Sequence, residues 1–253
     1  MTLDLGVRQP PGLPEFIVGE QAEHIRLMGW LANWVSGDPH AAAQAWGASL
    51  GAYLQAEVGA GKTHLLQGAL SEVVMRGWGG IALGPQQCQM WDPIDPAWPT
   101  LAVIDDCNRL PPEHQHLAFN LFLQAAESRA SAGAVPDGAG LGLPGGALYI
   151  LAAGLVPPAQ LAVRDDLRTR LAWGLHFSLT PLDDEGVRLA LSREAARRGL
   201  PLPDELLHHL LTRFSRNLGQ LMALLDRLDD YALAAHRSPT VPLLKQMLAL
   251  ETP

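Results

Sequence analysis

Short apolar runs alternate with helix-like patterns over the first 180 residues. The runs are of strand length and lie at residues 49–56, 81–83, 101–104 and 147–153. Between them, apolar residues recur three and four positions apart at residues 20–35, 63–76 and 113–128, a spacing that predicts amphipathic helices. Strands that alternate with helices predict an α/β domain built on a parallel sheet.

After Pro181 the pattern becomes purely helical. Apolar faces with helical spacing cover residues 183–198, 203–214, 217–236 and the stretch that begins near Thr240. We therefore expect a flexible, Pro-rich tail over residues 1–15, an α/β domain over 16–180 and a small all-helical domain over 181–253. Residues 129–146 are glycine-rich and lack periodicity, so they are predicted to be a mobile insertion that leads back into the sheet.

Composition narrows the class of protein. The formal net charge is −8, so a broad basic surface for binding nucleic acid is not expected, and we predict no direct sequence-specific DNA binding. Two cysteines, Cys88 and Cys107, are too few for a disulfide framework. Because the chain also has no 18-residue apolar run and no secretory signal pattern, we expect a cytoplasmic protein without a membrane span.

A phosphate-binding loop is the sharpest chemical signal. Residues 56–63 read AEVGAGKT, between a predicted strand and a predicted helix, where Ala56 replaces the usual leading glycine. Backbone amides from Gly59 to His64, including Ala60 and Gly61, would wrap phosphate oxygens at the helix N-terminus. Lys62 would reach the terminal phosphates, and Thr63 would coordinate Mg²⁺. The predicted ligand is ADP or ATP; a glycine turn beside a surface lysine is the alternative.

Two acids follow the strand at 101–104. Asp105 would complete the Mg²⁺ shell, and Asp106 would orient an attacking water. Paired acids after a strand are also typical of solvated turns. Their position about forty residues after a phosphate-binding loop favours the catalytic interpretation.

Three stretches resemble the AAA+ ATPases related to the bacterial initiator DnaA. They are GAGKTHLL at 59–66, FIVG at 16–19 and DLRTRLAWGL at 166–175. The resemblance implies that Val18 and Gly19 contact the adenine. It also implies that Arg170 is an arginine finger, which acts on the nucleotide of a neighbouring subunit. A surface salt bridge is the alternative role for Arg170.

Further stretches resemble the Hda family of DnaA inactivators, which lack the DNA-binding domain. They lie at residues 157–161, 179–185, 198–204 and 240–248. The sequence stops near residue 250, where an initiator would continue into a basic helix-turn-helix domain. This resemblance implies negative regulation of replication initiation, with two partners: the DnaA initiator and the β sliding clamp of DNA polymerase III.

The sequence departs from that family at three places. The N-terminal clamp motif lacks its glutamine and keeps only Leu3 and Leu5. Gly154 and Leu155 stand where the family has a polar residue that senses the γ-phosphate. Gly219 replaces the lid arginine, for which Arg216 is a candidate substitute. We therefore expect a weak ATPase that holds nucleotide and activates hydrolysis on its partner.

Other functions remain open at this stage. A small-molecule kinase would need a substrate lid with clustered arginines, and the insertion at 129–146 has only Arg129. A helicase loader would need a basic strip with aromatic residues, which is not evident. A stand-alone AAA+ ATPase and a homo-oligomer are compatible with the sequence.

Overall fold

The computed structural model describes residues 22–34, 49–94, 98–132, 147–215 and 217–251. The chain divides into two compact units. The first contains the sheet and ends at Leu179, and the second begins at Thr180 and also includes the short loop Val58–Gly61. The predicted tail at 1–15 lies outside the described residues.

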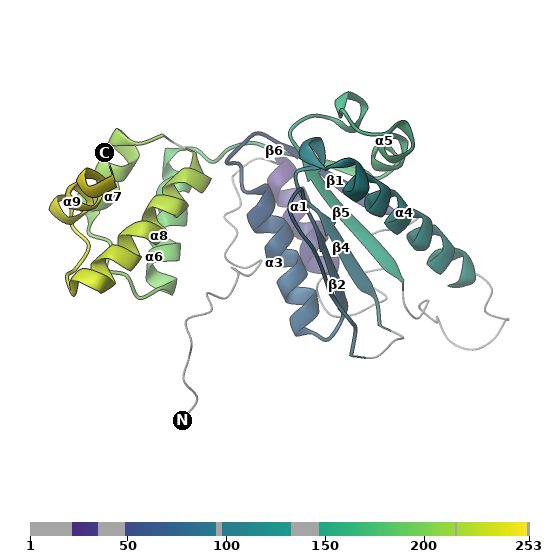
Figure 1. Ribbon diagram of the computed structural model, residues 1–253, viewed down its shortest axis with the longest axis horizontal. Helices are drawn as coiled ribbons and strands as arrows, with labels where there is room; N and C mark the ends of the chain where they lie inside the picture. Colours follow the sequence, from purple (N-terminus) through teal and green to yellow (C-terminus); the bar gives the residue numbers. More distant parts are fainter. Residues whose placement is uncertain (1–21, 35–48, 95–97, 133–146, 216, 252–253) are drawn as a thin grey trace. The chain divides into compact units, whose positions relative to one another are not determined.

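Six strands of the first unit form one sheet in the order β3-β2-β4-β5-β1-β6 (Figure 1). Their bounds are β1 (Gly51–Ala56), β2 (Gly79–Leu83), β3 (Cys88–Trp91), β4 (Thr100–Ile104), β5 (Leu148–Gly154) and β6 (Leu175–Leu179). All neighbouring strands are parallel except β2 and β3. The central strands are apolar on both faces because helices cover both. The predicted parallel α/β fold is thus confirmed, with one antiparallel edge strand added.

Helices cover the sheet on both sides. Helix α3 (Lys62–Met75) and helix α4 (Pro112–Ala132) lie on opposite faces (Figure 1). Helix α1 (Ala22–Trp34) packs on β6, and helix α5 (Asp165–Ala172) packs beside α4. Two short 3-10 turns, η2 (Cys107–Arg109) and η3 (Pro158–Gln160), follow β4 and β5.

Helix α4 corrects one sequence-based boundary. The helix was expected to end at residue 128, where the glycine-rich insertion was expected to begin. It continues to Ala132, so residues 129–132 are helical. Alanine and serine in this segment carry no apolar face, which is why the periodicity ends before the helix does. Residues 133–146 lie outside the described residues.

The second unit is helical. It consists of α6 (Asp184–Arg197), α7 (Asp204–Arg213), α8 (Leu218–Ala235) and α9 (Val241–Glu251). Asp183 and Asn217 cap α6 and α8 by accepting from the backbone amides of Gly186 and Gln220. Leucines from all four helices form its core, among them Leu191, Leu210 and Leu225. Within the part of the chain that the structure describes, no helix has the length and apolarity needed to cross a membrane.

Candidate functional site

The phosphate-binding loop connects β1 to α3. The strand ends at Ala56 and the helix begins at Lys62. Gly59 and Gly61 have φ angles of 85° and 88°, which residues with a side chain rarely adopt. The two glycines therefore set the path of the backbone from the strand into the N-terminus of α3, where amide groups favour anions.

Lys62 is buried, with only 7% of its surface exposed. Its ammonium donates to the backbone carbonyls of Ala56 at 2.7 Å and Glu57 at 2.8 Å. Burial lowers the pKa of Lys62, and the nearby carboxylates of Asp105 and Asp106 act in the opposite direction. A buried ammonium held by two carbonyls can transfer its hydrogen bonds to phosphate oxygens without a large movement.

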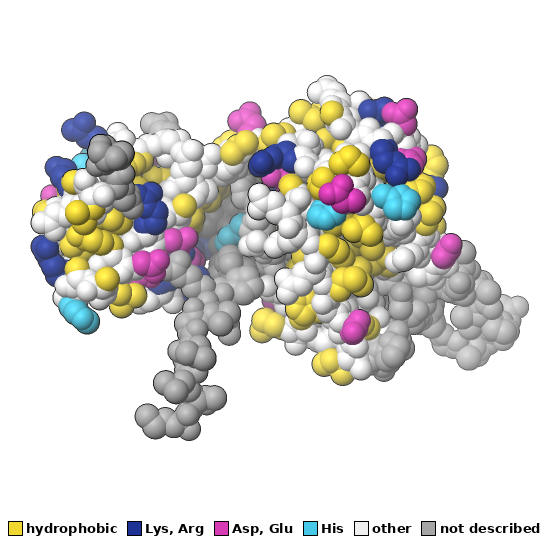
Figure 2. All heavy atoms as spheres, viewed as in Figure 1, with side chains coloured by type: hydrophobic (Ala, Val, Ile, Leu, Met, Phe, Trp, Pro, Cys, Tyr) yellow, Lys and Arg dark blue, Asp and Glu magenta, His cyan; other side chains and the backbone are white. Residues whose placement is uncertain are grey.

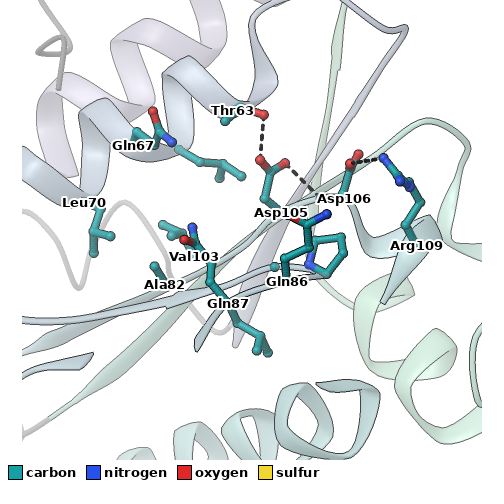
Figure 3. A pocket seen from close by; sticks show the side chains of 14 residues that line it. Thr63, Gln67, Leu70, Ala82, Gln86, Gln87, Val103, Asp105, Asp106 and Arg109 are labelled. Atoms are coloured by element: carbon teal, nitrogen blue, oxygen red, sulfur yellow. Dashed lines mark hydrogen bonds and ion pairs between the residues drawn. The ribbon is translucent and has the colours of Figure 1, made fainter. Parts of the chain in front are cut away.

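Asp105 lies at the carboxyl end of β4 and faces the start of α3 (Figure 3). Its carboxylate accepts from the Thr63 hydroxyl at 2.6 Å and from the Asp106 amide at 2.8 Å. Burial raises the pKa of Asp105, and the hydrogen bond from Thr63 partly offsets this effect. A hydroxyl and a carboxylate in direct contact at a phosphate-binding loop are a ligand pair suited to Mg²⁺.

Asp106 is held in a strained position beside this pair. Its φ is 49°, in the left-handed region that non-glycine residues seldom occupy. The carboxylate lies 3.7 Å from the Arg109 guanidinium (Figure 3). Strain of this kind is common where the surrounding structure must hold a functional side chain.

A cavity of about 330 Å³ opens next to these acids. Thr63, Gln67 and Leu70 of α3 line one side, and Ala82 and Val103 of the sheet line another (Figure 3). The segment between β2 and β3 closes it with Gln86 and Gln87. The charged side chains of its lining are Asp105, Asp106 and Arg109, and the glutamines add further polar groups.

The residues present fit a magnesium nucleotide. The loop supplies two glycines with positive φ, a buried lysine and a helix N-terminus. The Thr63 and Asp105 oxygens are already in contact with each other. Lys62, Thr63 and Asp105 therefore lie close together, with Asp106 beside them.

The end of β5 leaves no room for a side chain at Gly154. A Cβ atom at Gly154 would overlap the hydroxyl of Tyr53, a β1 residue that is 1% exposed. That hydroxyl donates to the Val156 carbonyl at 2.7 Å, and burial raises the pKa of Tyr53. The Leu155 amide donates to the Asn108 side chain at 3.3 Å. Sequence reasoning missed Tyr53 and Asn108, because their hydrogen-bond partners lie 103 and 47 positions away in the chain.

Arg170 lies in the last turn of α5, and it is far from the phosphate-binding loop along the sequence. It is half-exposed, and its guanidinium lies 5.0 Å from the ring centre of Trp173. The other two arginines of this region are paired, Arg164 with Asp166 and Arg168 with Asp165. Among the described residues, Arg170 has no carboxylate within ion-pair distance. The described residues thus offer no partner for a surface salt bridge, which was the alternative role of Arg170.

Five of the predicted site residues lie outside the described residues. They are Leu3, Leu5, Val18, Gly19 and Arg216. Gly219 lies in the first turn of α8. Of the remaining loop residues, Ala60 lies between the two glycines and His64 lies in the first turn of α3.

Comparison with solved structures defines the fold of the chain. Domain III of the replication initiation protein DnaA from Thermotoga maritima superposes with a TM-score of 0.65 at 17% identity, over 94% of this chain and 95% of that chain. AMPPCP-bound DnaA from Aquifex aeolicus gives 0.56 at 18% identity, over 86% and 64%. The RuvB branch migration motor of T. maritima gives 0.58 at 15% identity, over 96% and 72%. The fold is therefore that of an AAA+ protein.

A family model narrows the identification. The model described as "Hda, lid domain" matches residues 183–248, which span α6, α7, α8 and most of α9. The helical unit is therefore similar to the lid domain of Hda. Together with the fold shared with the DnaA domain, this match supports the Hda-like, DnaA-related AAA+ protein that the sequence motifs indicated.

Proposed function

We propose that this chain is a negative regulator of replication initiation that stimulates hydrolysis of ATP bound to DnaA. The observation that carries the proposal is Arg170, a half-exposed arginine without a carboxylate partner among the described residues, on a helix anchored in an AAA+ unit. The Hda-type lid supports the same partner. An arginine finger supplied in trans can contribute about 10³–10⁵ in rate.

The chain's own nucleotide has a separate role in this proposal. The amides of the loop at Gly59–Thr63 and the Lys62 ammonium would hold the phosphates of ADP or ATP. Thr63 and Asp105 would hold Mg²⁺, which neutralises phosphate charge when bound. The nucleotide would act as a structural ligand that stabilises the folded chain.

Arg170 would act on the partner's nucleotide. Its guanidinium is planar, permanently charged and able to donate two parallel hydrogen bonds to phosphate oxygens. It would stabilise the negative charge on the γ-phosphoryl oxygens as the bond to the β-phosphate breaks and water attacks. Lysine would keep the charge but not the fork.

The test is DnaA-bound ATP hydrolysis in the presence of clamp-loaded DNA. Arg170→Ala should abolish stimulation by the full chain, and Arg170→Lys should restore it poorly. Arg76→Ala is the matched control, because Arg76 is an exposed arginine paired with Glu72 on α3. All three variants should bind ADP like the parent.

Two results would overturn parts of the proposal. If Arg170→Ala stimulates as well as the parent, Arg170 is not the finger. If the parent never stimulates DnaA, the regulator function falls. A stand-alone AAA+ ATPase would then be the remaining candidate. A kinase is disfavoured because Arg109, already close to Asp106, is the single arginine among the residues lining the cavity.

The proposal includes a second partner, the sliding clamp, which Leu3 and Leu5 would bind. A peptide of residues 1–8 should bind the β clamp weakly by placing the two leucines in an apolar groove. Prepending Gln-Leu should strengthen binding, because glutamine adds an orienting hydrogen bond. Fluorescence anisotropy of both peptides measures the difference. Equal affinity would show that these leucines are not a clamp motif.

A further inference from the structure

The C-terminal end of α5 is held firmly on one side. Leu167 and Leu171 are 0% and 2% exposed and pack into the core beneath α4. On the same helix, the Arg168 guanidinium donates to the Leu161 carbonyl at 3.1 Å and pairs with Asp165. The helix therefore has little freedom to rotate or slide, and its outer face is fixed in space.

The residue after Trp173 fixes the turn that follows. Gly174 lies so close to β1 that a Cβ atom there would overlap the Gly51 carbonyl oxygen. The Trp173 amide donates to the Arg170 carbonyl at 3.2 Å, which closes the last turn. Trp173 thus lies between a capped helix end and a close backbone contact, and its backbone position is well defined.

The Trp173 ring nevertheless lies outside the core. It is 67% exposed, and the Arg170 guanidinium lies 5.0 Å from its ring centre. Packing within the first unit does not account for a tryptophan exposed to this extent. Arginine and tryptophan are also the residues most enriched where a few side chains dominate a protein interface.

We propose that Trp173 is a positioning residue for Arg170. The ring supports one face of the guanidinium by a cation–π contact and leaves its N–H edge free for phosphate oxygens. It thereby limits the conformations of a flexible side chain before the partner arrives, and it excludes water from one face after docking. This inference rests on the proposed function of Arg170, and it assigns to Trp173 an effect on rate.

The contact itself can be tested without any partner. The full chain, which has seven tryptophans, would be labelled with 5-fluorotryptophan and observed by fluorine NMR. Loss of one resonance in Trp173→Phe assigns the Trp173 signal. Arg170→Ala should shift the Trp173 signal and leave the others in place. Arg76→Ala should leave the Trp173 signal where it is in the parent. An unmoved Trp173 signal in Arg170→Ala would refute the contact.

The effect on rate separates positioning from simple docking. Trp173→Ala should lower the maximal stimulated rate about three- to tenfold, as expected for loss of a cation–π contact that is partly desolvated. Trp173→Phe should retain more of the rate than Trp173→Leu, because leucine keeps apolar bulk without a π face. The thermal midpoint and ADP affinity should equal those of the parent.

A double-mutant cycle decides the mechanism. If Trp173 acts through the Arg170 guanidinium, Trp173→Ala should lower the maximal rate by a smaller factor in the Arg170→Lys background than in the parent, because an ammonium has no flat face to stack on the ring. Additive losses would overturn the proposal, as would a change confined to the DnaA concentration at half-maximal rate. If Arg170→Ala abolishes stimulation while all Trp173 variants match the parent, the positioning role fails and the finger stands. If the parent chain does not stimulate ATP hydrolysis on DnaA, both the finger role of Arg170 and the positioning role of Trp173 are refuted.

Discussion

Lys62 illustrates how this protein tolerates a buried charge at a binding loop. An ammonium group removed from water is costly unless hydrogen bonds and opposite charges compensate. Here two backbone carbonyls at the end of β1 accept hydrogen bonds from the ammonium, and Asp105 and Asp106 lie close enough to favour its charged form. This compensation keeps a positive charge at the start of α3, where the phosphates of the proposed nucleotide would lie.

Replacing Lys62 should remove nucleotide binding. In Lys62→Ala the charge and both hydrogen bonds are lost, so ADP affinity measured by calorimetry should fall below detection. The sequence contains one other lysine, Lys245, which is exposed on α9 and provides the matched control. Lys245→Ala should bind ADP like the parent. Unchanged affinity in Lys62→Ala would show that the nucleotide site lies elsewhere.

Some residue contacts were predictable and others were not. Lys62 and Thr63 belong to a motif whose spacing reflects one strand–loop–helix geometry. Asp105 follows a second parallel strand, whose carboxyl end lies at the same edge of the sheet, so its proximity to them could be deduced. The Tyr53 hydroxyl bonds a carbonyl 103 positions away, and only the register of β1 against β5 brings the two together. The contact of Arg170 with Trp173 is local, but its geometry depends on how Gly174 meets β1.

At the scale of elements, burial determines what a sequence pattern reveals. Strands β4 and β5 are buried along most or all of their length and read as continuous apolar runs. Strand β3 was not predicted, because Cys88, Gln89 and Met90 are exposed and its hydrogen bonds to β2 are made by backbone alone. Strand β6 was also missed, since only Phe177 and Leu179 point inward. Five residues give too short an alternation to recognise.

The C-terminal end of α6 holds a cluster of charges that is sensitive to pH. Arg197 and Arg198 donate to the Glu194 carboxylate, with hydrogen bonds of 2.7 Å and 2.6 Å. Arg198 also pairs with Asp226 on α8, which ties two lid helices together. Desolvation alone would raise the pKa of Glu194, but the hydrogen bonds from the two arginines outweigh it and hold the pKa below its usual range.

Glu194 should therefore make folding sensitive to acid. A lowered folded-state pKa contributes stability that is present above the unfolded pKa, about 4.3 for glutamate, and is lost as pH falls through the folded value. Glu194→Gln should reduce the free energy of unfolding at neutral pH by roughly 1.5–3 kcal/mol. It should also make the free energy of unfolding fall less steeply as the pH is lowered. Urea unfolding followed by far-UV circular dichroism measures both effects.

The matched control is Glu185→Gln, because Glu185 lies exposed in the first turn of the same helix. It should leave the acid dependence of the parent largely unchanged. If Glu194→Gln and Glu185→Gln show equal stability and equal acid dependence, the charge cluster makes no net contribution to the lid.

At the scale of the whole molecule, the chain combines a loop and acids that fit a magnesium nucleotide with a strand end that has no side chain at Gly154. Lys62, Thr63 and Asp105 lie close together at that loop. A side chain at Gly154 would overlap the Tyr53 hydroxyl. In the proposed function, this combination favours retention of nucleotide over its hydrolysis. The net charge is −8, and acidic as well as basic side chains lie on the face drawn in Figure 2, so that face is not uniformly basic as a broad surface for nucleic acid would be.

The isolated chain should consequently hydrolyse ATP at well under ~1 s⁻¹, below the roughly 1–100 s⁻¹ of dedicated kinases. Gly154 has no side chain to contact the γ-phosphate, and in the proposed function Arg170 acts on a neighbour's nucleotide rather than on its own. Phosphate release should therefore be unchanged in Arg170→Ala and proportional to chain concentration, with Lys62→Ala giving the background rate. A rate per chain that increases with concentration and disappears in Arg170→Ala would instead show that copies of this chain present Arg170 to one another.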